Sequence, residues 1–192
     1  MHFSVAFVAF VATTWALVPA PLEQRKADKG DEIVKLARQQ IGKPYVWGGG
    51  NCKGATKEGQ SKAGFDCSGL NKYVVCQVSD KKYDLPNHAQ TQYNDYKKWG
   101  GKHIAIKDAQ PGDMFYYSHN SSRSLLTIRV QQVAEILPDD CKHDVTHTNI
   151  KASKDTVINA PAPGRNIAEK DSSWYLDNSE LRVCPYAIRF WD

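Results

Sequence analysis

The sequence has 192 residues, of which 41% are hydrophobic and 24% are charged, so it fits about one domain and excludes collagen-like, low-complexity and wholly disordered chains. Twenty-five Lys and Arg against 21 Asp and Glu leave a net charge of +4. This surplus suits an anionic surface or polymer, but the chain has no Lys/Arg block of the kind that nucleic-acid-binding proteins carry, and we expect no nucleic-acid partner.

Residues 1–16 are apolar and contain no Lys, Arg, Asp or Glu. The apolar run Phe3–Ala12 is too short to span a bilayer, but it is typical of a secretory signal, with the small residues Thr14 and Ala16 at positions −3 and −1 of the cut. A buried N-terminal helix is the less favoured alternative, because a strongly polar stretch follows at once. We expect a signal peptide, then a flexible leader at residues 17–30, and a secreted mature protein without a membrane anchor.

Three helices are predicted in the first half of the chain. The first runs from Asp31 to Gln40, and the second from Cys67 to about Val78, with a glycine-rich loop over residues 44–64 between them. The third is expected over Asn87–Trp99.

After Gly101 the residue pattern changes from helical to short segments typical of β-strands. They are residues 114–117, 148–152, 156–159 and 186–191. Helices followed by strands indicate an α+β fold, with helices packed on an antiparallel sheet. We expect one domain over residues 31–192.

Export of the chain would allow its cysteines to form disulfide bonds; the sequence has five. Four of them could pair in an oxidising compartment, in three possible connectivities, which leaves one thiol over. The cluster of Cys141, His143 and His147 matches no zinc signature, and we expect no metal.

Cys67 stands at the predicted start of a helix, where free N–H groups and the helix dipole favour a thiolate. The neighbouring Asp66 opposes this, and is interpreted as a helix cap or as a grip for a substrate cation. A cysteine nucleophile also needs a base and a group that orients the base. His147 and Asn159 fall on successive predicted strands and could lie side by side, in the chain order that papain-like thiol hydrolases use. From the residues alone, each of the three could equally be structural.

Motifs single out this trio. In order, the chain contains Pro44-Tyr-Val-Trp-Gly-Gly, Phe65-Asp-Cys-Ser-Gly-Leu and Gln110-Pro-Gly-Asp, and it resembles the NlpC/p60 family of cell-wall cysteine peptidases. The spacing from His147 to the Ala-Pro pair that follows Asn159 agrees with the family's pattern. The resemblance covers roughly residues 31–192 and implies a papain-like NlpC/p60 fold.

The resemblance also implies roles. Cys67 would be the nucleophile, His147 the general base and acid, and Asn159 the group that orients the imidazole. Tyr45, Asp66 and Ser68 match positions that line the family's substrate pocket, where Asp66 would hold the free amine of an N-terminal L-alanine.

Two further expectations concern the neighbours of these residues. The Cys67 N–H and the Tyr45 hydroxyl would face the oxyanion. Trp47 and the adjacent glycines are expected to form a tight turn packed on the helix.

The implied activity is that of a secreted, monomeric thiol peptidase acting on bacterial peptidoglycan or muropeptides, without metal or cofactor. The bond cut would be the γ-D-glutamyl–L-diamino acid amide of the stem peptide. Two alternatives stay open: a same-fold amidase or acyltransferase acting on another amide or lipid, and a catalytically disabled wall-binding protein.

The sequence also departs from the family pattern. His147-Thr-Asn stands where His-Val-Gly is usual, and an insert around residues 118–138 is either a lid or exosite or a gene-model artefact. Asn120 begins a glycosylation sequon in that insert, which is either modified or left unmodified.

With Cys67 reserved for catalysis, the other four cysteines become the disulfide candidates. A bond from Cys52 to Cys76 would pin the glycine-rich loop to the nucleophile helix. Cys141 and Cys184 would then join the insert to the last strands.

Overall fold

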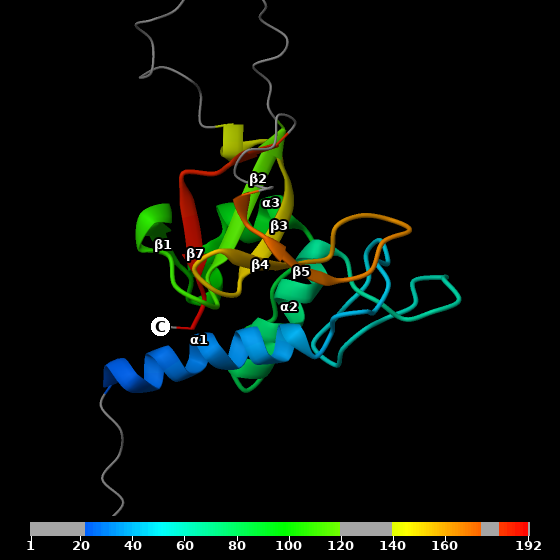
Figure 1. Ribbon diagram of the computed structural model, residues 1–192, viewed down its shortest axis with the longest axis horizontal. Coiled ribbons are helices and arrows are strands. Elements are labelled where there is room, and N and C mark those ends of the chain that lie inside the picture. Colours follow the sequence, from blue (N-terminus) through cyan, green and yellow to red (C-terminus); the bar gives the residue numbers. More distant parts are fainter. Residues whose placement is uncertain (1–21, 120–139, 174–180, 192) are drawn as a thin grey trace, which may run out of the picture.

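The computed structural model describes residues 22–119, 140–173 and 181–191 (Figure 1). The expected signal peptide, nearly all of the expected insert and the sequon at Asn120 lie outside these ranges.

The helices are α1 (Leu22–Arg38), α2 (Cys67–Val78) and α3 (Ala89–Asn94), with 3-10 turns at η1 (Tyr96–Trp99), η2 (Ile106–Asp108) and η4 (Asp140–Lys142). The bounds of α2 are those predicted. The segment predicted as one third helix is divided instead into α3 and η1, which meet at Asp95.

The expected flexible leader is wrong for residues 22–30, because α1 begins at Leu22 instead of Asp31. Leu, Glu, Gln, Arg, Lys and Ala are good helix formers, and they fill this segment up to Gly30. Gly30 lies within this helix, at a position where neighbouring segments pack so closely that there is no room for a side chain. A Cβ at this position would collide with the carbonyl oxygen of Pro111 and the ring of Trp191.

The described strands form one sheet in the order β1-β7-β2-β3-β4-β5, with β6 also paired to β2, and every pairing is antiparallel. They are β1 (Lys102–Ala105), β2 (Met114–His119), β3 (Val145–Lys151), β4 (Thr156–Asn159), β5 (Ala168–Asp171), β6 (Leu181–Val183) and β7 (Tyr186–Arg189). The predicted α+β class is confirmed. Strands β1, β5 and β6 were not expected.

The two faces of the sheet carry separate apolar clusters. Ile150, Ile158 and Ile188 point toward the helices and join Leu70 and Val74 of α2 in the larger one. Neighbouring residues of a strand point to opposite faces, and the other face of the sheet carries a smaller cluster. Its buried members are Phe115, Tyr117, Val157 and Ala187. The helices therefore cover one face, with α1 lying across the end of α2 (Figure 1).

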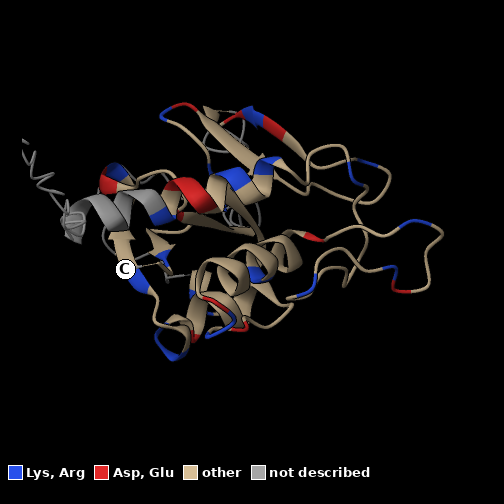
Figure 2. Ribbon diagram, turned by 90° about the horizontal axis from the view of Figure 1, so that it is seen from below, with Lys and Arg blue, Asp and Glu red and all other residues tan. Residues whose placement is uncertain are grey.

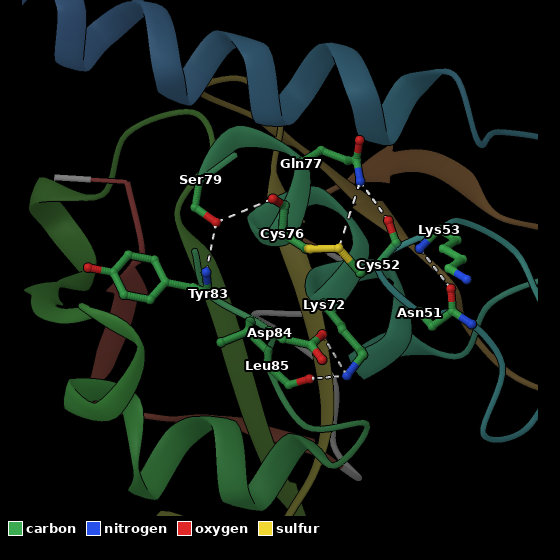
Figure 3. The surroundings of a disulfide bond; sticks show 10 residues. All are labelled: Asn51, Cys52, Lys53, Lys72, Cys76, Gln77, Ser79, Tyr83, Asp84 and Leu85. Carbon is green, nitrogen blue, oxygen red and sulfur yellow. Dashed lines mark hydrogen bonds and ion pairs between the residues drawn. A yellow bond between two sulfur atoms is a disulfide. The ribbon is translucent and has the colours of Figure 1, made fainter. Parts of the chain in front are cut away.

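The glycine-rich loop projects from the body of the domain beside α2 (Figure 1). Along its length it carries the exposed cations Lys53, Lys57 and Lys62 and a single acid, Glu58, and Figure 2 shows charged segments along the projecting loop. A disulfide from Cys52 to Cys76 holds the base of the loop against α2 (Figure 3).

The structure pairs the cysteines as the sequence analysis expects. Beside the first disulfide, Gln77 Nε2 donates a hydrogen bond of 2.6 Å to the carbonyl oxygen of Cys52 (Figure 3). The second disulfide joins Cys141 in η4 to Cys184, which follows β6. Cys141 is therefore not available to bind a metal.

Over residues 22–119, 140–173 and 181–191 no helix combines the length and the apolar character needed to cross a membrane.

Candidate active site

Cys67 is the first residue of α2, and within the described chain it is the cysteine that has no disulfide partner. It is only 9% exposed. Burial raises the pKa of its thiol to about 12, and the neighbouring Asp66 adds to the rise. The backbone N–H groups of Thr148, Ser68 and Cys67 itself lie against the sulfur and act in the opposite direction. The resting side chain is therefore a neutral thiol surrounded by donors that favour its thiolate.

Asp66 is the N-cap of α2, as one of its two interpretations expects. Its Oδ1 accepts hydrogen bonds from the Gly69 N–H at 2.6 Å and from the Ser68 hydroxyl at 2.9 Å, and its Oδ2 accepts one from the Gly48 N–H at 2.9 Å. Burial raises the pKa of this carboxyl group, and the three donors oppose the rise. The backbone N–H of Ser68 is a fourth donor, so the buried carboxylate is surrounded by groups that stabilise its charged form.

The glycines of the two motifs allow the loop and the helix to touch. Asp66 donates its N–H to the Gly49 carbonyl at 3.0 Å, and Asn87 Nδ2 donates to the Gly48 carbonyl at 2.7 Å. A Cβ on Gly69 would collide with the Gly49 carbonyl oxygen. Gly69 is thus required by the contact that holds the loop against the first turn of α2, while a Cβ on Gly49 would collide with Val46 and the Gly64 carbonyl oxygen within the loop.

His147 and Asn159 come together across the β3–β4 pair. Ile150 pairs with Ile158, and continuing this register places the two side chains on the same face, one diagonal apart. His147 Nε2 donates to Asn159 Oδ1 over 2.8 Å, which leaves Nδ1 as the basic atom of the imidazole. Burial lowers the pKa of the half-buried His147 to about 4, while the bond to Asn159 opposes the fall. The imidazole is therefore neutral near pH 7 and able to accept a proton.

The nucleophile, base and orienting candidates meet at the end of α2. The Thr148 N–H that faces the Cys67 sulfur belongs to the residue directly after His147, so the first turn of α2 meets β3 next to the residue that carries the imidazole. Asn159 reaches the same imidazole from β4. On the other side of β3, Tyr117 of β2 lies opposite His147, with the two ring centroids 6.0 Å apart.

Tyr45 and Ser68 also lie at this site. The pKa of the half-buried Tyr45 is raised, chiefly by burial and then by Cys67 and Asp66, which places its hydroxyl near both groups. Ser68 is buried, and its hydroxyl is used in the bond to Asp66.

The expectation that Trp47 packs on the helix is wrong, because its side chain is 78% exposed. Its neighbour Val46 is buried instead, and the positive φ of 70° at Gly48 turns the chain directly after Trp47. The extended stretch before this turn alternates its side chains, so that only one of the two apolar neighbours can point inward. The indole stands at the surface, two residues along the chain from Tyr45.

Residues 42–173 match the sequence profile of the NlpC/P60 family, more than half of the chain. The chain belongs to the NlpC/P60 family.

Among named relatives, the peptidoglycan endopeptidase RipA of Mycolicibacterium smegmatis is 36% identical over 94 residues, which make up 47% of this chain and 17% of RipA. RipB of Mycobacterium tuberculosis, also named a peptidoglycan endopeptidase, is 35% identical over 88 residues, 44% of this chain and 33% of RipB. The chain thus spans a third or less of the length of these relatives.

Solved structures agree on the fold. The structure of the peptidoglycan hydrolase RipB from M. tuberculosis superposes with a TM-score of 0.57 at 20% identity, covering 90% of this chain and 69% of that one. RipD from the same organism, a non-catalytic NlpC/p60 domain protein adapted to peptidoglycan binding, gives a TM-score of 0.56 at 19% identity, covering 84% and 96%.

Beneath the site of this NlpC/P60 domain lies a buried polar network that the sequence analysis did not identify. It consists of Asn71, Gln92, Tyr116 and Thr148, each with no exposed surface. The available signal was Asn71, a polar residue four positions after Cys67 on the buried face of the predicted helix. The sequence shows that such a residue must find partners inside the protein, but not which strands supply them.

Proposed function

We propose that this chain is an exported cysteine peptidase that hydrolyses an amide bond in peptidoglycan stem peptides. The observation that supports the proposal best is the 2.8 Å bond between His147 and Asn159 beside the buried free thiol of Cys67. Family membership supports the substrate class, since relatives in the family are named peptidoglycan endopeptidases. Residues 1–16, with the composition of a secretory signal, support export.

Acylation begins with a neutral Cys67 thiol and a neutral His147 imidazole. The Cys67 thiol passes its proton to His147 Nδ1 as the sulfur attacks the amide carbonyl carbon, and the Asn159 oxygen stabilises the imidazolium through Nε2–H. The oxyanion that develops faces the Cys67 N–H and the Tyr45 hydroxyl, donors of a kind worth about 3–4 kcal/mol each to the transition state. His147 then gives its proton to the departing amine, and the C–N bond breaks to leave a thioester.

Deacylation uses the same groups. A water molecule loses a proton to His147 and attacks the thioester carbonyl. The C–S bond breaks, the proton returns to the sulfur, and the acid product leaves with Cys67 and His147 again neutral.

We assign the cut bond to the γ-D-glutamyl–L-diamino acid amide of the stem peptide. Asp66 supports this assignment, because its buried carboxylate next to Cys67 suits an ammonium group such as that of an N-terminal L-alanine. The negative charge of this carboxylate favours substrates with a free, charged amine over N-blocked ones.

A second candidate function is peptidoglycan binding without turnover. The observation in its favour is the pKa of about 12 for the Cys67 thiol, which makes the sulfur a poor nucleophile unless His147 takes its proton. The non-catalytic character of RipD shows that this fold accommodates such a role.

The test is mass spectrometry of a purified muropeptide digest, with the wild-type chain beside Cys67→Ala. We expect wild type to release a dipeptide ending in D-glutamate, and the variant to release none. Binding of muropeptides by both proteins, with no product from either, would contradict the peptidase and establish the second candidate.

A further inference from the structure

Thr148 directly follows His147 on β3, and its buried hydroxyl takes part in two hydrogen bonds. Thr148 Oγ1 donates to the Phe115 carbonyl of β2 at 2.8 Å and accepts from Asn71 Nδ2 of α2 at 2.9 Å. One hydroxyl group therefore joins β2, β3 and α2.

Each of the two bonded residues lies on the same helix or strand as one of the proposed reacting residues. Asn71 lies one helical turn after Cys67 on the same face of α2, and Thr148 directly follows His147 on β3. The bond from Asn71 to Thr148 thus joins the helix that carries Cys67 to the strand that carries His147. A valine at 148 could pack in this place, but it could not form the bond.

The network extends to the first turn of the helix. Gln92 of α3 donates from Nε2 to the Ser68 carbonyl at 2.9 Å, and its Oε1 accepts from the Tyr116 hydroxyl at 3.1 Å and from Asn71 Nδ2 at 3.3 Å. α2 is therefore held at its first and second turns from the same side. Bonds of this kind are costly to break in a site closed to water, because each buried partner is then left unsatisfied.

We propose that Asn71 and Thr148 are positioning residues, which set the distance and angle between the Cys67 sulfur and the His147 imidazole by a hydrogen bond between the helix and the strand that carry them. The proposal rests on the proposed peptidase function for its kinetic consequence. Proton transfer between sulfur and nitrogen depends steeply on their separation, and a misplacement of about 1 Å costs on the order of 100-fold in rate.

The first variant is Thr148→Val, which keeps the shape of the side chain and removes the hydroxyl. We expect kcat on a free-amine muropeptide to fall by about 10- to 100-fold with KM within about 2-fold of wild type, since no group on the substrate is touched. Thr148→Ser restores the hydroxyl and should bring kcat back to within about 3-fold. Asn71→Leu removes the bond from the helix side and should reproduce the loss if Thr148→Val fails to fold.

Thr156→Val is the matched control. Thr156 is also a sheet threonine, and its hydroxyl donates to Glu169 Oε1 at 2.6 Å, but it lies away from α2. This variant should lower the unfolding temperature without changing kcat. A Thr148→Val variant that loses stability as the control does, yet keeps the wild-type kcat, would overturn the proposal, as would failure of Thr148→Ser to restore activity.

A second readout separates this proposal from the proposed function. With four of the five cysteines in disulfides, iodoacetamide reports on Cys67. We expect Thr148→Val and Asn71→Leu to slow alkylation at pH 7 by about 10-fold, and Thr156→Val to leave it unchanged, because His147 must be in place to take the proton. If wild type cleaves no muropeptide, this pattern still supports the positioning role, whereas equal alkylation rates in all the variants would overturn it.

Discussion

Arg189 and Asp113 form a bidentate ion pair, in which Nε and Nη2 of the guanidinium each lie 2.8 Å from a different oxygen of the carboxylate. Asp113 is fully buried and also accepts the N–H of Gln110 at 2.7 Å. The Asp of the Gln-Pro-Gly-Asp motif thus closes its own turn and anchors β7.

Asp113→Asn should therefore destabilise the domain strongly. Removing one partner of a buried pair leaves the other charge uncompensated, and we expect a loss of about 3–5 kcal/mol in the free energy of unfolding, measured with urea. The contrasting variant is Glu169→Gln, which breaks the more exposed pair with Arg38 and should cost less than about 1 kcal/mol. Equal losses in the two variants would show that burial does not govern these pairs.

The stability of the protein should depend on pH through His147. Its pKa of about 4 in the folded chain lies below the ordinary 6.5, so between these values the unfolded chain binds a proton that the folded chain does not. The contribution of His147 to stability is therefore complete above pH 6.5 and is lost as the pH falls to 4. Unfolding temperatures of wild type and His147→Gln should converge over this window as the pH is lowered. Parallel curves would mean that His147 titrates alike in both states.

Asp66 should decide whether a substrate with a free amine is preferred. Asp66→Asn keeps an oxygen that can cap α2 but removes the negative charge. We expect the ratio of kcat/KM for a muropeptide with free L-alanine to that for its N-acetylated form to fall at least about 10-fold in the variant, since a charge-assisted bond to a buried carboxylate is lost. An unchanged ratio in a variant that still folds would leave Asp66 with the capping role alone.

The Cys52–Cys76 disulfide closes 24 residues of chain, including the whole lysine-bearing loop. Replacing both cysteines by serine should lower the stability by about 3 kcal/mol, because the unfolded chain gains freedom. The same double change at Cys141 and Cys184, which are 43 residues apart, should cost slightly more. A tryptic map of the unreduced protein checks the pairing directly, and a peptide joining Cys52 to Cys141 or Cys184 would contradict it.

Local signals were enough to predict much of the frame. The bounds of α2 follow from the Asp66 cap and the apolar stripe after it, and β4 matches its predicted range of 156–159 because apolar residues stand between clear turn signals. The pairing of His147 with Asn159 follows from their spacing on adjacent antiparallel strands, a relation that needs no knowledge of the rest of the fold.

What escaped prediction depends on contacts between distant segments. β5 reads Ala-Glu-Lys-Asp, without an apolar alternation, and it is a strand because β4 offers it hydrogen bonds. Gly30 was expected to lie in the flexible leader, and the reason for a glycine within α1 is its contact with Pro111 and Trp191, which are distant in the sequence. Asn71 and Thr148 lie 77 residues apart, and neither reveals the other in the sequence.

The order of the sheet has a consequence for synthesis on the ribosome. β7, formed by residues 186–189, lies between β1 and β2, which begin at residues 102 and 114 and are therefore made much earlier. A nascent chain that has not yet released this strand has β1 without its neighbour and Asp113 without its arginine. The domain therefore cannot complete its sheet step by step as it emerges, because the strand between β1 and β2 is synthesised last.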